Sequence, residues 1–100
     1  MISNQILQST LEGFKAIARV ELCVADMDGN VAASTSDSLD GCLPAVRAFI
    51  DSPADSQEVQ GNQFFKIYDD QQLEYILVVG GAGENFYMIG KMAAFQVQNL

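Results

Sequence analysis

The chain has 100 residues, of which 49% are hydrophobic, and this length accommodates one small domain around a single core. Five Lys and Arg residues against thirteen Asp and Glu residues give a formal net charge of −8, which opposes contact with phosphate backbones and anionic lipid surfaces. The chain contains no His, which excludes the Ser-His-Asp and Cys-His pairs of most hydrolases. We therefore expect a globular, non-enzymatic domain without metal or cofactor that binds neither nucleic acid nor membrane by itself.

The expected compartment is the cytoplasm. The N-terminal residues MISNQILQ lack the basic region and the unbroken apolar region of a signal peptide, and no apolar run reaches the ~18 residues of a membrane span. Cys23 and Cys42 lack the CxxC spacing of a zinc or redox site, so we interpret both as reduced thiols.

The chain opens with a predicted amphipathic helix at about residues 3–19. Apolar side chains recur there at steps of three and four residues, and Ser3 or Asn4 is available as the N-cap. Gly13 lies inside the helix, where it lowers helix stability by about 1 kcal/mol relative to Ala. We interpret Gly13 as a position of close packing.

A β-hairpin and a second helix follow. Val20, Leu22 and Val24 alternate with Glu21, Cys23 and Ala25, and extended residues resume at 31–35. The turn residues Asp-Met-Asp-Gly-Asn stand between the two segments. Residues 34–42 are small and polar, which predicts a mobile connector. The apolar periodicity of residues 43–50 predicts a short helix.

The second half predicts strands and a last helix. Residues 57–68 and 73–80 are interpreted as strands, and residues 58–61 leave open whether a third strand is present. Residues 75–79 are apolar on both faces, which indicates a central strand. Apolar periodicity then continues from Glu84 to the last residue.

This order of helix, two strands, helix, two or three strands and helix predicts an α+β fold with one antiparallel sheet and flanking helices. PAS-like sensor domains and the roadblock-type dimerisation fold both resemble this order. The sequence leaves the choice between the two open.

Hydroxyl side chains at the end of the hairpin form the first candidate binding site. Ser34, Thr35, Ser36 and Ser38 lie near Arg47 of the short helix in our interpretation, and a guanidinium with several hydroxyls suits a small carboxylate. In that case Arg47→Ala should weaken ligand binding by about 2–3 kcal/mol. The alternative is a solvated loop with Arg47 on the outer face of its helix.

Two tyrosines complete the candidate ligand site. Tyr68 and Tyr75, next to Phe64 and Phe65, could line a pocket with their hydroxyl groups as polar contacts. Aromatic residues in strands fill cores more often, and this alternative is favoured.

The last helix has more apolar surface than one sheet can cover. One apolar line faces the core, and a second line consists of Met88, Met92 and Phe95. We expect this second line to form a homodimer contact, and the alternative is that the helix at 3–19 covers it within one monomer. The helical pattern is unbroken at Leu100, so we expect the helix to continue in a longer parent protein.

Two segments resemble a known family. Residues 22–34 (LCVADMDGNVAAS) are similar to the hairpin that opens the sugar-diacid recognition domain, the N-terminal sensor of carbohydrate diacid regulators and of related purine-catabolism regulators. Residues 75–81 (YILVVGG) and 87–100 resemble the closing strand and exit helix of that domain. The resemblance implies a PAS-like fold, a small-molecule effector and a DNA-binding helix-turn-helix outside this chain.

The resemblance carries over two candidate ligand residues, Ser34 and Gly41. Where the family has an Arg-Ile-Gly motif and a nearby His suited to gripping carboxylates, this chain has Ser38-Leu39-Asp40-Gly41 and no His. The sequence thus predicts a ligand-sensing and dimerisation domain of a bacterial transcription regulator that signals through its C-terminal helix. The alternative function is a roadblock-type interaction module without a ligand.

Overall fold

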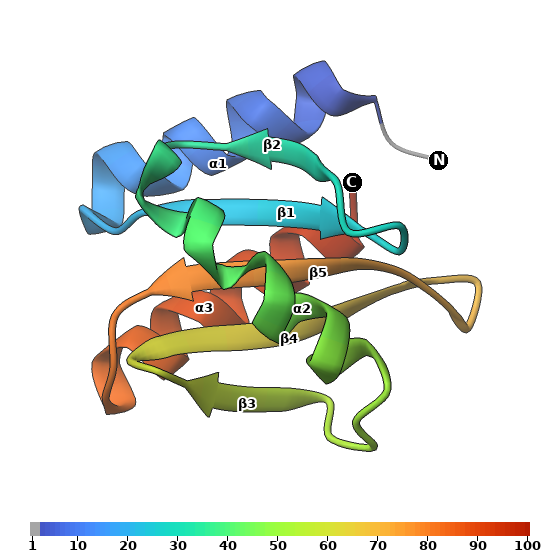
Figure 1. The fold of residues 1–100 in the computed structure, drawn as a ribbon. Coiled ribbons are helices and arrows are strands. Elements are labelled where there is room, and N and C mark those ends of the chain that lie inside the picture. The colour runs from blue at the N-terminus through green and yellow to red at the C-terminus, as the bar shows by residue number, and fades with distance from the viewer. Residues whose placement is uncertain (1–2) are drawn as a thin grey trace.

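The computed structural model describes residues 3–100, apart from the side chains of Ser38 and Asp40. The helices are α1 (Asn4–Ala18), the 3-10 helix η1 (Asp37–Cys42), α2 (Leu43–Ile50) and α3 (Glu84–Gln98), and the strands are β1 (Leu22–Asp26), β2 (Val31–Ser34), β3 (Ser56–Val59), β4 (Asn62–Asp69) and β5 (Gln72–Gly80) (Figure 1).

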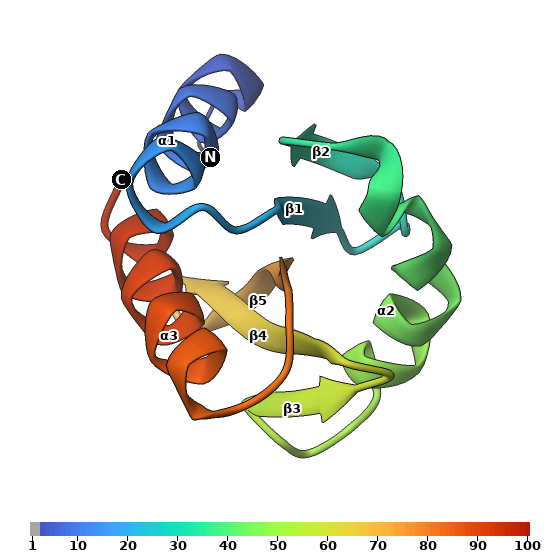
Figure 2. The same cartoon turned by 90° about the vertical axis from the view of Figure 1, so that its left-hand side faces the viewer.

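The five strands form one antiparallel sheet in the order β2-β1-β5-β4-β3. Figure 2 shows α1 and α3 on one face of this sheet and α2 on the other. The α+β prediction is confirmed, and the architecture is compatible with a PAS-like fold. The strand count that the sequence left open is three, because Gln60 and Gly61 both have positive φ and turn the chain between β3 and β4.

The strand β5 lies at the centre of the sheet, as its apolar run predicts. Its alternate side chains enter two separate apolar clusters, one on each face. The cluster under α1 and α3 contains Leu7, Leu11, Val20, Leu22, Val24, Ala33, Phe65, Ile67, Tyr75, Leu77, Val79, Ala93 and Val97. The cluster under α2 contains Cys23, Ala25, Leu39, Val46, Phe49, Phe64, Ile76 and Val78.

Three local predictions have clear outcomes. The Ser3 hydroxyl accepts the N–H of Ile6 at 3.1 Å, so Ser3 is the N-cap of α1. The close packing predicted at Gly13 is wrong, because a Cβ at this position would have no neighbour within 4 Å. The connector at 34–42 contains η1 rather than an irregular chain, and Leu39 anchors that turn in the cluster under α2.

The outer edge of β2 is covered by a side chain of α1. Thr35 donates its N–H to the carbonyl of Leu22, so the N–H and C=O of the preceding residue, Ser34, point away from β1. The Gln8 amide accepts that N–H at 2.9 Å and donates to that carbonyl at 2.7 Å. Gln8 therefore replaces a sixth strand at this position.

Replacing Gln8 with Ala should lower the free energy of unfolding by about 1–2 kcal/mol, because two partly buried hydrogen bonds are lost. Urea denaturation monitored by circular dichroism measures this change. The neighbouring variant Ser9→Ala, at an exposed position of the same helix, should stay within about 0.5 kcal/mol of the wild type. Equal midpoints for the two variants would contradict the role of Gln8.

Candidate functional site

The hydroxyls proposed to bind a ligand are engaged in local hydrogen bonds. Ser34 donates its hydroxyl to the carbonyl of Ser36 at 2.7 Å and accepts the N–H of Ser36 at 3.2 Å. The Thr35 hydroxyl accepts the N–H of Leu22 at 2.9 Å and lies 3.2 Å from a carboxylate oxygen of Glu21. The Ser34 contacts stabilise the loop after β2, and the Thr35 contacts connect that loop to the start of β1.

The carboxylate of Glu21 lies next to this loop. Glu21 forms an ion pair with Lys15 at 2.7 Å. The hydrogen bond from Lys15 is the largest cause that lowers the pKa of the Glu21 carboxyl, so the group is negatively charged at neutral pH. Glu21 thus already engages both the Thr35 hydroxyl and the Lys15 ammonium, the groups that a ligand carboxylate would need here, which disfavours the small anion that the sequence suggested.

Arg47 lies at the other end of the hairpin from these hydroxyls. Its Nε atom is 2.8 Å from the position that a Cβ would take at Gly29, in the turn between β1 and β2. The hydroxyl loop begins at the far end of β2, three residue steps or about 10 Å from the first residue of the strand. The structure does not bring Arg47 together with Ser34, Thr35 and Ser36.

Gly41, the other position carried over from the family resemblance, lies in η1, where a Cβ would meet no atom within 4 Å. Room for a side chain means that close packing does not require glycine here. A role for Gly41 in ligand binding stays a prediction.

This geometry changes the expectation for Arg47→Ala. If a small dicarboxylate such as tartrate binds at Ser34–Ser36, the variant should alter its affinity by less than about two-fold, because a charge about 10 Å away is largely screened at the surface. Calorimetric titration of both proteins tests this. A loss of about 2–3 kcal/mol would instead restore the site that combines Arg47 with the hydroxyls.

The two tyrosines of the predicted ligand site, Tyr68 and Tyr75, lie away from both Arg47 and the hydroxyl loop. Tyr75 belongs to the cluster under α1 and α3, and burial is the main cause that raises the pKa of its hydroxyl. Tyr68 donates its hydroxyl to Asp55 at 3.1 Å, and its backbone N–H donates to the Gln98 side chain at 3.0 Å. Both tyrosines line a cleft of about 110 Å³ beside the end of α3. This cleft is separate from Arg47 and from the hydroxyls.

The predicted dimer residues form an exposed apolar surface on α3. Met88, Met92 and Phe95 are 54%, 60% and 71% exposed, so α1 does not cover them within the monomer. Phe14 of α1 lines the same shallow groove. We call Phe14, Met88, Met92 and Phe95 the apolar groove.

Charge is sparse around the apolar groove. Residues 85–100 contain no Asp or Glu, although the chain carries thirteen acidic residues in total. Lys91, the single basic residue of this segment, lies 5.6 Å from the centre of the Tyr87 ring and 3.3 Å from its hydroxyl. The longest stretch of the chain without an acidic residue is thus also strongly apolar.

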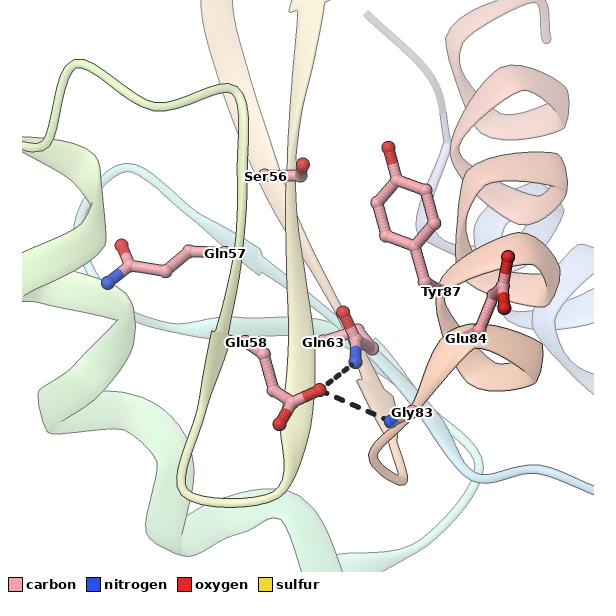
Figure 3. Close-up of a pocket in the computed structure, with 7 residues that line it drawn as sticks. All are labelled: Ser56, Gln57, Glu58, Gln63, Gly83, Glu84 and Tyr87. Carbon is pink, nitrogen blue, oxygen red and sulfur yellow. Dashed lines mark hydrogen bonds between the residues drawn. The ribbon is translucent and has the colours of Figure 1, made fainter.

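A second cleft, which the sequence analysis missed, lies between β3 and the start of α3 (Figure 3). Its volume is about 410 Å³, and its lining includes Glu58, Gln63, Glu84 and Tyr87. Glu58 accepts hydrogen bonds from the Gln63 side chain at 2.7 Å and from the N–H of Gly83 at 3.2 Å. No sequence spacing indicated this contact, because it depends on the turn between β3 and β4.

Reactive side chains do not converge in the described part of the chain. Within residues 3–100, no three His, Cys, Asp or Glu side chains are placed to hold a metal ion. Neither cysteine forms a disulfide, and burial raises the pKa of the Cys42 thiol. Of the helices described, none has the length and apolar character needed to cross a membrane.

No model of a known protein family matches the sequence, and no curated protein matches it significantly.

Proposed function

We propose that this chain is a cytoplasmic sensory and dimerisation domain of a bacterial transcription regulator, and that α3 both forms the dimer contact and carries the signal toward a DNA-binding domain. The observation that carries the proposal is the apolar groove, with Met88, Met92 and Phe95 more than half exposed. Soluble proteins usually bury such a patch against a partner.

The chemistry of the groove favours a second copy of this chain as the partner. Two copies of a protein with a net charge of −8 repel each other, and the repulsion is smallest where acidic side chains are absent. Residues 85–100 meet this condition. A two-fold contact places the same surface on both copies, so each exposed apolar side chain is buried twice in the dimer.

The packing of α2 favours a roadblock-type interaction module as the second candidate. A small-molecule effector enclosed under α2 would need a cavity between this helix and the sheet. Here that space is filled, because Val46 and Phe49 of α2 are buried against the sheet and the Phe49 and Phe64 rings contact edge to face at 5.9 Å. A module that dimerises without a small molecule needs no cavity there.

Two measurements test these proposals. Sedimentation equilibrium at tens of micromolar should give a dimer, and the mass of a 10.8 kDa monomer at these concentrations would contradict the proposed function. Native mass spectrometry of the purified protein then separates the candidates, because a dimer that retains a small molecule supports the sensor and a dimer without one supports the interaction module.

A further inference from the structure

The strand β3 has an open outer edge. Lys66 donates its N–H to the carbonyl of Asp55 at 3.0 Å, and hydrogen-bonded positions alternate along an antiparallel ladder. The intervening residues of β3, Ser56 and Glu58, therefore direct their N–H and C=O groups away from β4. Figure 1 shows β3 as the last strand on its side of the sheet.

The two outer edges of the sheet differ in whether a side chain pairs with their outward backbone groups. At β2, the Gln8 side chain occupies the outward N–H and C=O of Ser34, as described above. At β3, the side chains of Ser56 and Glu58 line the cleft toward α3 instead of covering the strand edge. An exposed edge of this kind pairs readily with another extended chain.

The cleft beside this edge carries two carboxylates and, next to Tyr87, one ammonium group, because Lys91 lies 3.3 Å from the Tyr87 hydroxyl. The side chains of Glu58 and Glu84 both line it (Figure 3). The two hydrogen bonds that hold Glu58 end on the same oxygen, Oε1, so its position is fixed while Oε2 is open to a cation. Gln63, one of the two donors, is only 4% exposed, which anchors the carboxylate to the sheet.

These charges decide between two possible occupants of the edge. Antiparallel pairing of β3 with a second copy of β3 would bring together two chains of net charge −8 at an edge that carries Asp55 and Glu58, and this repulsion disfavours the pairing. An extended segment that carries a basic side chain meets the same carboxylates favourably.

We propose that the edge of β3 binds an extended basic segment of another protein, which adds to the sheet as a sixth strand and places a Lys or Arg side chain in the cleft between Glu58 and Glu84. The backbone groups of Ser56 and Glu58 provide the affinity for an extended chain, and the carboxylates select the basic side chain. The proposal rests on the strand edge with Glu58 and Glu84, whereas the α3 dimer rests on Met88, Met92 and Phe95. The two surfaces adjoin, because Ser56 and Phe95 line one pocket and Tyr87 lines both the cleft and the apolar groove.

The test is a titration of the full chain with synthetic peptides, followed by the backbone amide signals in nuclear magnetic resonance spectra. The probe is a capped eight-residue peptide of alternating Thr and Val with one central Lys. We expect the amide signals of Ser56 and Glu58 to shift, and we expect the same peptide with Glu in place of Lys to bind about ten-fold more weakly. Equal binding of the Lys and Glu peptides would overturn the proposal.

Two variants test separately how the Glu58 carboxylate and the outward N–H of Ser56 contribute to peptide binding. Glu58→Gln should weaken binding of the Lys peptide by about five-fold, whereas the control Glu12→Gln, which removes an equal charge on α1, should leave it unchanged. Ser56→Pro removes an outward N–H at an edge position that tolerates Pro, and it should abolish binding. Wild-type affinity in Glu58→Gln or in folded Ser56→Pro would overturn the proposal.

A peptide variant covers the case in which Ser56→Pro does not fold. The Lys peptide with N-methyl groups on alternate backbone nitrogens cannot add as a strand, so its binding at the affinity of the parent peptide would overturn strand addition. Self-association of the wild type that persists in Met92→Glu and disappears in Glu58→Lys or Ser56→Pro would identify a second copy as the occupant and would also overturn the proposal.

Discussion

Met92→Glu is expected to convert the proposed dimer into monomers, with an increase of the dimer dissociation constant of about 100-fold or more. Met92 is 60% exposed in the monomer and lies in the apolar groove between Met88 and Phe95. In a two-fold contact the substitution removes two buried apolar side chains, each worth about 1.5–3 kcal/mol, and introduces two carboxylates without a partner of opposite charge. Sedimentation equilibrium of both proteins measures the change.

The matched control for this experiment is Ala48→Glu. Ala48 is an exposed helical residue of α2, which lies on the opposite face of the sheet, so the variant carries the same additional negative charge away from the groove. We expect it to dimerise like the wild type. If both variants dissociate equally, overall charge rather than the groove controls association. If Met92→Glu remains a dimer, the contact lies elsewhere.

Gly90→Ala is expected to lower the free energy of unfolding by about 1–3 kcal/mol. A Cβ at Gly90 would lie 2.3 Å from Cε2 of Phe65, which is too close for any contact, and 3.2 Å from Cγ2 of Val79, which is a tight contact. Phe65 is buried and its ring packs against Tyr87 at 5.8 Å, so the ring has little space into which to move. Overpacking of this kind forces the helix away from the sheet.

Gly13→Ala provides the control in another helix. Nothing lies within 4 Å of a Cβ at Gly13, and the higher helix propensity of Ala should stabilise the protein by about 0.5–1 kcal/mol. Thermal unfolding detects both effects, since 1 kcal/mol shifts the Tm of a domain of this size by about 4–8 °C. Shifts in the same direction for the two variants would contradict the close approach of α3 to the sheet at Gly90.

The features that depend on local pattern could be predicted from the amino-acid sequence alone. The five apolar residues at 75–79 required a strand buried on both faces, and β5 is the central strand. The turn at Gly29, with a φ of 83°, follows from the Asp-Gly pair between two extended segments. Helical periodicity likewise predicted that α3 has an apolar line beyond the one facing the core, because the spacing of Met88, Met92 and Phe95 places them on one side of a helix.

Which of these groups contact one another depends on the packing of the whole domain. Gly13 and Gly90 look alike in the sequence, yet only Gly90 approaches the sheet closely, because the contact depends on how each helix is placed on it. Arg47 was expected beside Ser34–Ser36 but lies at Gly29, since the course of η1 and α2 sets where that side chain ends. Glu58 meets Gln63 and Gly83 through the turn at Gln60 and Gly61 and the return of the chain into α3. Local periodicity specifies which face of an element is apolar, whereas contacts between distant segments depend on the packing of the whole domain.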